Sequence, residues 1–208
     1  MLELGGKSPF TVFEDANLDS AIYGAVASIF DPSRQSCVAG SRLVAQTDIA
    51  NALIAQMQTI AARIKIGDLV LKETEMGLLY TTGQLAIFER VVAHRRSQGP
   101  TIVCGGMQAT ATNEMFFQPT ILDCPSPDLR IVKTEMFGPV VSVIHFKGEA
   151  KAIPLANQTK NGPAAGIFTC SGVRSHRVAK AVKAAIVWVN TYRAVSPIAE
   201  FGGIKSLG

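Results

Sequence analysis

The stretch AAGIFTCSGVRSHRVAKAVKAAIVWVNT, residues 164 to 191, decides the fold. It begins with a short apolar run over 164–169, continues with a helical pattern over 172–183 and ends with a second apolar run over 185–191. Short apolar runs without in–out alternation are typical of strands that are buried on both faces, as in parallel sheets. The stretch therefore predicts a strand, a helix and a second strand of an α/β protein.

The same alternation extends over the rest of the chain. Apolar spacing predicts helices over 18–29, 49–64, 81–99 and 148–159, and strands over 41–46, 101–106 and 140–146. This order predicts an α/β fold in which a mostly parallel open sheet is covered by helices on both faces. We interpret residues 1–208 as a single domain.

Local signals add detail to this prediction. The region from Asp15 to Asn17 is expected to cap the first helix, and Thr47 or Asp48 the second. Pro119 favours an edge strand or a connection for the extended segment 116–124, because proline cannot donate to a strand ladder. Pro154 is expected to disturb the helix over 148–159 or to end its first part.

Composition excludes several classes of protein. Apolar residues make up 48% and charged residues 17%, as in a globular chain. The net charge of +4 is spread thinly, so neither nucleic-acid nor membrane-surface binding is expected. The longest apolar stretches reach about ten residues, whereas a membrane span requires roughly 20. We therefore expect no membrane partner.

The cysteines and histidines indicate neither a metal site nor a disulfide framework. The four cysteines contain no CxxC pair, and the three histidines are scattered, so zinc-ligand spacing is absent. A long chain with a large apolar fraction rarely depends on disulfides, which favours a reducing, cytoplasmic setting. Cys104, Cys124 and Cys170 lie in or beside predicted strands, and we interpret them as packing residues.

Four loop-like patches combine glycine with reactive or polar residues: LELGGK (2–7), RQSCVAGSR (34–42), TEMFGPV (134–140) and FGGIK (201–205). We expect them at the carboxyl ends of strands, where open parallel sheets place their sites. Each patch alone is weak evidence for a functional site. GGK is a common turn, and a free cysteine is more often a small buried residue than a nucleophile.

The patches also restrict the chemistry that Cys37 could perform. No histidine accompanies a glycine-rich loop, so a cysteine-protease arrangement has no distinctive support. A carboxylate base, either Glu3 or Glu135, is the natural alternative. A carboxylate cannot efficiently deprotonate a free thiol, but it could activate a water for thioester hydrolysis if burial raises its pKa.

Taken in order, LELGGKSP, RQSCVAGSR, EMFGPVVSV, VWVNTY and FGGIKSLG resemble the catalytic half of an aldehyde dehydrogenase. The resemblance covers nearly the whole chain, and the 34-residue spacing from Glu3 to Cys37 is usual in that family. It implies oxidation of a small-molecule aldehyde to a carboxylic acid with NAD or NADP. It also implies that the full-length protein is a homo-oligomer.

The resemblance implies a role for each matching residue. Cys37 would be the nucleophile that forms a thioacyl intermediate, with its backbone N–H in the oxyanion hole, and Glu3 the base that activates water. Glu135 would bind the nicotinamide ribose, and Phe137 would lie beside the nicotinamide. The remaining cofactor contacts would come from Leu4, Gly5 and Gln84.

Several features depart from the family pattern. Arg34 stands where a glycine is usual, and Ile87 replaces a lysine near Gln84. Both ends look cut, and the first half of the family pattern, which carries most of the cofactor domain, is absent. We therefore expect a piece of a longer protein that is weak or inactive by itself. Two alternatives stay open: a catalytically silent interaction or structural module, and a residual ester or thioester hydrolase.

Overall fold

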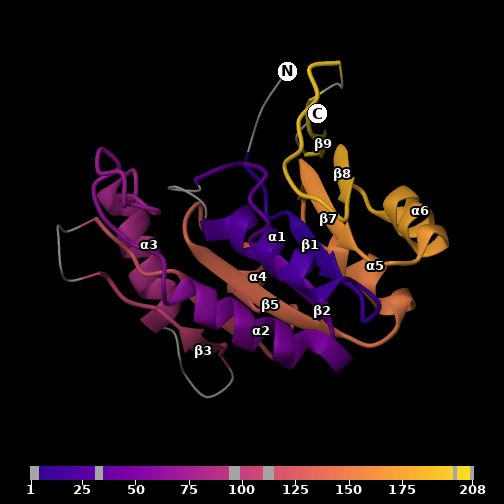
Figure 1. Cartoon of the computed structure of the whole chain (residues 1–208), viewed down its shortest axis with the longest axis horizontal. Coiled ribbons are helices and arrows are strands. Elements are labelled where there is room, and N and C mark those ends of the chain that lie inside the picture. The colour runs from indigo at the N-terminus through magenta and orange to yellow at the C-terminus, as the bar shows by residue number, and fades with distance from the viewer. Residues whose placement is uncertain (1–4, 31–34, 94–98, 110–114, 199–200, 207–208) are drawn as a thin grey trace.

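The structure is a computed structural model that describes residues 5–30, 35–93, 99–109, 115–198 and 201–206. Its helices are α1 (Leu18–Phe30), α2 (Thr47–Ala61), α3 (Thr82–Ala93), α4 (Arg130–Lys133), α5 (Glu149–Asn157) and α6 (Gly172–Ala181). Its strands are β1 (Pro9–Val12), β2 (Arg42–Gln46), β3 (Thr101–Cys104), β4 (Thr120–Cys124), β5 (Val140–Phe146), β6 (Asn161–Gly162), β7 (Ala164–Phe168), β8 (Ile186–Val189) and β9 (Ile204–Lys205). Figure 1 shows their arrangement.

Seven strands form one twisted sheet in the order β3-β4-β5-β2-β1-β7-β8. Every pairing is parallel except that of β3 with β4, which is antiparallel. The stretch that predicted the fold is confirmed as β7, α6 and β8, and Ala164 pairs with Ile186 in register. Strands β6 and β9 form a separate antiparallel pair.

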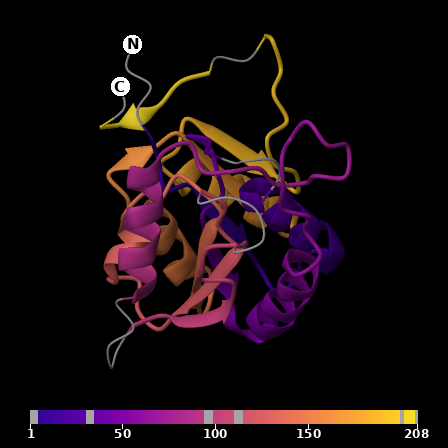
Figure 2. The same ribbon diagram turned by 90° about the vertical axis from the view of Figure 1, so that its left-hand side faces the viewer.

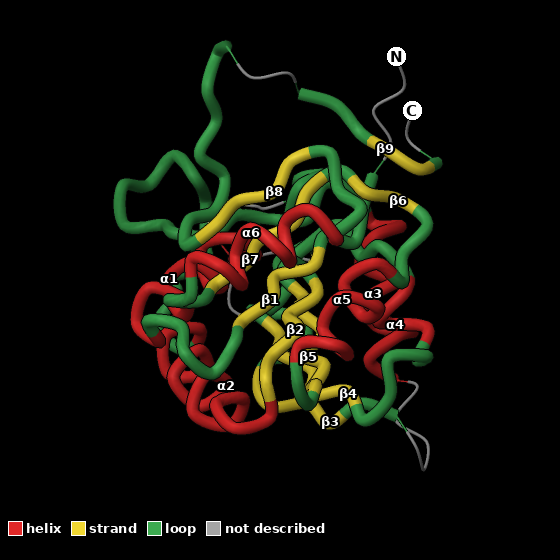
Figure 3. Tube along the Cα trace, turned by 90° about the vertical axis from the view of Figure 1, so that its right-hand side faces the viewer, coloured by secondary structure: helices red, strands yellow, loops and turns green. Residues whose placement is uncertain are grey.

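Helices cover both faces of the sheet, which confirms the predicted α/β class. Helices α1 and α2 lie on one face, and α3, α4 and α5 lie on the other (Figures 2 and 3). One apolar cluster joins α1 and α2 to residues such as Phe10 and Leu43, while a second cluster joins α4, α5 and α6 to residues such as Phe13 and Val44. Leu43 and Val44, which are neighbours in β2, therefore pack into different clusters, because successive side chains of a strand point to opposite faces of the sheet.

A buried arginine connects the sheet to α5. Arg42, the first residue of β2, is fully buried, and its Nη1 and Nη2 donate to the carbonyl oxygens of Leu155 (2.6 Å) and Ala156 (2.7 Å). These carbonyls belong to the last turn of α5, where helix carbonyls lack the usual i+4 donor; Leu155 O also accepts from the Gln158 backbone N–H at 3.3 Å. Burial lowers the pKa of Arg42 to about 10. Arg42 therefore acts as a C-terminal cap supplied by a neighbouring strand.

Several local predictions are wrong. Strand β4 is internal, because Pro119 precedes it and leaves the ladder intact, whereas β3 forms the partly exposed edge. Helix α5 runs through Pro154 without ending. Strand β1, which follows directly on the first glycine patch, is absent from the predicted order.

The helix ends give mixed outcomes. Asn17 Oδ1 accepts from the Ser20 backbone N–H at 2.9 Å, as predicted for α1. For α2 the capping position is Gln46, with no side-chain cap, and the Thr47 hydroxyl instead donates to Phe146 O. Helix α3 is described over Thr82–Ala93, and residues 94–98 of the predicted helix lie outside the described residues. Among the helices that the structure describes, none has the length and apolarity to span a membrane.

Candidate active site

The candidate site lies at the amino ends of the parallel strands, and the prediction that it lies at their carboxyl ends is wrong. Residues 5–8 lead into β1, residues 35–41 into β2 and residues 134–139 into β5. Pro9 pairs with Arg42, and Arg42 pairs with Ser142, so these three strands are adjacent. The segments that precede them therefore meet at one edge of the sheet, together with Pro163 ahead of β7.

Cys37 is half-buried in a turn immediately before β2. The Ala39 backbone N–H donates to Ser36 O at 3.0 Å, which closes the turn around it. A Cβ built on Gly6 would lie 3.2 Å from Cys37 O and 2.4 Å from Pro163 Cγ. Only glycine permits this approach, so the first patch packs directly against the backbone of the cysteine turn.

Two consecutive residues hold the cysteine turn from either side. The Tyr192 hydroxyl donates to Val38 O at 2.8 Å, and Arg193 Nη2 donates to Ser36 Oγ at 3.0 Å. The ring of Tyr192 packs against Trp188 with centroids 4.7 Å apart. Burial raises the pKa of Tyr192 far above its usual range, so the phenol keeps its proton and donates. The bond to Val38 O holds the backbone after Cys37, and the bond to Ser36 Oγ holds the side chain before it.

Glu135 contacts the first glycine patch. Its Oε1 accepts from the Gly6 backbone N–H at 2.8 Å, and a Cβ on Gly5 would lie 1.8 Å from its Oε2. The space left free at Gly5 thus holds the carboxylate of Glu135. Burial raises the pKa of Glu135, and the Gly6 N–H and the charge of Lys7 oppose that shift.

Phe137 and Gln84 lie next to each other. Gln84 Nε2 donates to Phe137 O at 3.4 Å, and Phe137 has a backbone φ of 53°. Gln84 also exchanges two hydrogen bonds with Thr81, which is the capping-box arrangement at the start of α3. The structure therefore brings Gln84, Phe137, Glu135 and Gly5 to one side of the site.

Three residues of the predicted site region, Glu3, Leu4 and Arg34, lie outside the described residues. The pairing of Glu3 with Cys37 and the approach of Leu4 to a cofactor therefore stay predictions. The same holds for the effect of Arg34 on the thiol. Gly5 and Cys37 are described, and their segments touch through Gly6.

The burial of Lys7 is not predicted by the sequence, because GGK is typical of a common turn. The side chain is 2% exposed, and its Nζ has no hydrogen-bond partner among the described residues. Burial lowers the pKa of Lys7 to about 7. Lys7 and Glu135 both line a cavity of about 410 Å³ beside the site.

The other cysteines differ from Cys37 and from one another. Cys124 is buried, and burial raises its pKa to about 12, in agreement with a packing role. Cys104 is half-buried in the edge strand. Cys170 is exposed after β7, so its assignment as a packing residue is wrong. Within the described ranges, no three His, Cys, Asp or Glu residues gather in a way that could hold a metal ion.

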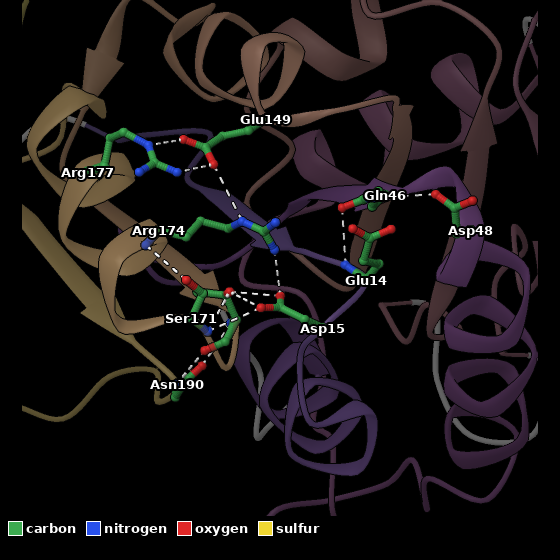
Figure 4. Close-up of polar contacts among 10 residues, drawn as sticks. Glu14, Asp15, Gln46, Asp48, Glu149, Ser171, Arg174, Arg177 and Asn190 are labelled. Carbon is green, nitrogen blue, oxygen red and sulfur yellow. Dashed lines mark hydrogen bonds and ion pairs between the residues drawn. The ribbon is translucent and has the colours of Figure 1, made fainter.

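The carboxyl ends of the strands carry a polar network instead (Figure 4). Asp15 accepts from the Thr169 hydroxyl (2.7 Å), the Ser171 backbone N–H (3.1 Å) and Arg174 Nη1 (2.7 Å). Arg174 also pairs with Glu149 at 3.4 Å. These bonds join the segment after β1 to α5 and α6. Because the carboxylate and the guanidinium are already paired, the network fits an anchoring role.

Comparisons with known proteins agree with this architecture. The model of the aldehyde dehydrogenase family matches residues 1–208. A (Z)-2-((N-methylformamido)methylene)-5-hydroxybutyrolactone dehydrogenase from Acinetobacter baylyi is 43% identical over 97% of this chain and 41% of its own length. A betaine aldehyde dehydrogenase from Cereibacter sphaeroides is 38% identical over the whole chain and 43% of its own length.

Solved structures show the same likeness. A putative aldehyde dehydrogenase from Burkholderia cenocepacia superposes with a TM-score of 0.95 at 38% identity, over 99% of this chain and 43% of that one. An aldehyde dehydrogenase from Bacillus cereus, solved as an NAD+ complex, gives 0.92 at 37% identity, over 98% and 41%. The chain belongs to the aldehyde dehydrogenase family. It spans about two fifths of the length of these relatives.

Proposed function

We propose that residues 1–208 form the catalytic domain of an NAD(P)-dependent aldehyde dehydrogenase that oxidises an aldehyde to a carboxylic acid. Family membership supports the reaction class. The observation that carries the proposal is the meeting of the Cys37 turn, the Gly5–Gly6 segment and Glu135 at one edge of the sheet. Glu135 lines the 410 Å³ cavity together with Gly6, whose backbone lies against that of Cys37, and this supports a reaction site beside the cavity.

Cys37 is the proposed nucleophile. Its thiolate would attack the aldehyde carbon, and the carbonyl oxygen would take up the negative charge. The backbone N–H of Cys37 would stabilise that oxygen, since a fixed N–H aimed at developing charge lowers the barrier. The bonds from Tyr192 and Arg193 to the flanking residues support this role, because they hold the turn in one conformation.

Glu3 is the proposed base. After oxidation, the acyl group would be held on Cys37 as a thioester, and a water must attack it to release the acid. A carboxylate that accepts a proton from that water speeds the attack. Glu3 precedes Gly5 and Gly6, and Gly6 packs against the Cys37 backbone, which supports a position within reach of the acyl group.

The residues present fit a nicotinamide cofactor, which supplies the hydride acceptor when it is bound. The carboxylate of Glu135 occupies the space at Gly5 and borders the 410 Å³ cavity, where it can accept from ribose hydroxyls. Phe137 would lie beside the nicotinamide, with Gln84 holding its backbone and contacting the ribose. Leu4 and Gly5 would approach the nicotinamide. The choice between NAD and NADP depends on residues outside this chain.

The same proposal covers the partners, the cellular location and the activity of the isolated chain. The partner is a small-molecule aldehyde, and the whole protein forms a homo-oligomer. All four cysteines are free, which supports a reducing, cytoplasmic location. Residues 1–208 alone would be a weak dehydrogenase, because they span only about two fifths of the length of their relatives.

The test is aldehyde-dependent formation of NAD(P)H by the whole protein that contains this chain. We expect Cys37→Ala to abolish it and Cys170→Ala, a change at an exposed cysteine, to leave it intact. Equal activity of the Cys37→Ala variant would refute the proposal. Labelling of Cys37 no faster than that of Cys104, Cys124 or Cys170 would favour the catalytically silent module.

A further inference from the structure

A second cavity is lined in part by Tyr192 and Arg193, the two residues that bond to the cysteine turn. It has a volume of about 630 Å³ and is bordered by α1, through Tyr23 and Ser28, and by residues 190–193 after β8. Its lining contains aromatic rings, hydroxyls and an amide, and no acidic side chain among the described residues. Arg193 is the one lining residue with a permanent charge. The cavity is therefore electropositive at one point.

Arg193 is held next to the nucleophile. Its backbone has a φ of 64°, in the left-handed region that residues other than glycine rarely adopt. Its Nη2 donates to the hydroxyl of Ser36, the residue before Cys37. An unfavourable backbone conformation persists only where the surroundings impose it, and such residues often mark functional sites. Here it brings a guanidinium to the cysteine turn.

Only part of the Arg193 guanidinium is hydrogen-bonded among the described residues. Arg193 Nη1 is buried and has no hydrogen-bond partner within the described part of the chain. None of the ion pairs found among the described residues includes Arg193. A buried donor without a partner costs free energy, and a guanidinium matches a carboxylate with two parallel bonds. Arg193 also lines the cavity, so its positive charge, which none of the described ion pairs neutralises, attracts an anion there.

We propose that the 630 Å³ cavity receives an aldehyde that also carries a carboxylate, and that Arg193 pairs with this carboxylate. The inference rests on the proposed function, because it places the aldehyde carbon at Cys37. Since Arg193 contacts the residue next to Cys37, the two ends of the substrate are separated by only a few carbons. Aldehydes with a trimethylammonium group would be disfavoured by the same charge.

Alkylation of Cys37 tests this charge recognition without cofactor or turnover. Iodoacetate and iodoacetamide transfer groups of nearly equal size, but only iodoacetate carries a carboxylate. We expect the ratio of their rate constants at Cys37, read by peptide mass spectrometry, to exceed the ratio at the exposed Cys170. Arg193→Gln should lower the Cys37 ratio about tenfold, as expected for loss of a charge-assisted hydrogen bond. Arg193→Lys should retain most of it.

A matched variant separates recognition from a structural role. Ser36→Ala removes the bond to Nη2 and keeps the charge of Arg193, so we expect it to preserve the iodoacetate preference. If Ser36→Ala lowers the ratio as much as Arg193→Gln does, Arg193 only holds the turn and the inference is wrong. An unchanged ratio in Arg193→Gln also overturns it.

The outcomes also separate this inference from the proposed function. A Cys37 that reacts readily but shows no preference for iodoacetate would refute the carboxylate site alone. A Cys37 inert to both reagents would refute its role as nucleophile. In the whole protein, Arg193→Gln should lower kcat/KM for a carboxylate-bearing aldehyde relative to an uncharged aldehyde of the same length. An unchanged ratio of the two kcat/KM values would contradict the inference.

Discussion

The backbone N–H of Gly6 donates a 2.8 Å hydrogen bond to Oε1 of Glu135, a residue 129 positions away in the sequence. This bond joins the segment before β1 to the segment before β5, on the two sides of β2 and its cysteine turn. Three motifs that are separate in the sequence thereby become one site. Each prediction below tests a part of that arrangement.

Gly5→Ala should displace the carboxylate of Glu135. The new Cβ would lie 1.8 Å from Oε2, so either the carboxylate or the backbone must move, and the Gly6 bond would be lost. In the whole protein we expect the KM for NAD(P)+ to rise about tenfold, the scale of one lost charged hydrogen bond. Gly172→Ala is the control, because nothing lies within 4 Å of its added Cβ. Unchanged cofactor affinity in Gly5→Ala would contradict the placement of Glu135.

Lys7→Met should raise stability at neutral pH and flatten its dependence on pH. The pKa of Lys7 is lowered from 10.5 to about 7 by burial, so between these values the unfolded chain binds more protons than the folded one. The free energy of unfolding must then rise with pH across that window, by about 1.4 kcal/mol per pH unit from this group.

Urea unfolding of the wild type and Lys7→Met at several pH values from 7 to 10 measures this effect as a difference. Arg42, Glu135 and Cys124 all interact electrostatically with Lys7, and they are present in both proteins, so the difference isolates the lysine. Parallel pH profiles for the two proteins would show that Lys7 is not buried as described.

Arg42→Met should destabilise the fold strongly. Two carbonyls at the end of α5 lose their charged donors. Leu155 O keeps the Gln158 backbone N–H, whereas Ala156 O is left without a donor among the described residues, and a buried unpaired acceptor costs about 1–3 kcal/mol. We expect the free energy of unfolding to fall by about 2–5 kcal/mol, measured by urea denaturation. Arg63→Met, at an exposed position after α2, should change it little. A similar small effect for both variants would argue against the cap.

Asp15 and Arg174 should be energetically coupled. A double-mutant cycle with Asp15→Ala and Arg174→Ala is expected to give about 1 kcal/mol, because the pair is partly shielded and belongs to a network. The exposed pair Asp128 and Lys133 should give a coupling near zero. Equal coupling in the two cycles would show that the network at the carboxyl ends adds nothing beyond surface charge.

The sequence predicted the class of fold well because its decisive signals were local. Strands β2, β5, β7 and β8 are apolar runs, and helices α1 and α6 show clear helical spacing, so periodicity alone located them. Strand β1 was missed because it is four residues long and begins with proline. The order of β3 and β4 depends on pairing between distant segments, which no local pattern encodes.

The site was predicted in part. The motifs that resemble a known family predicted Cys37, Glu135, Phe137, Gly5 and Gln84 as site residues. The structure brings together the segments that carry them, and their roles stay predictions. The sequence did not show that these residues lie at the amino ends of the strands. That placement requires knowing that each motif precedes its strand and does not follow it. Tyr192, Arg193 and Lys7 were not singled out, since their roles come from contacts across the fold.

The most direct test of the central claim is to trap the acyl group. The whole protein carrying Glu3→Gln is mixed with aldehyde and NAD(P)+, quenched in acid and analysed by peptide mass spectrometry. We predict an acyl adduct that accumulates on Cys37, because the oxidation proceeds while the water attack is slowed, and that is absent from a variant that also carries Cys37→Ala. An adduct on another cysteine, or none despite NAD(P)H formation, would contradict the account.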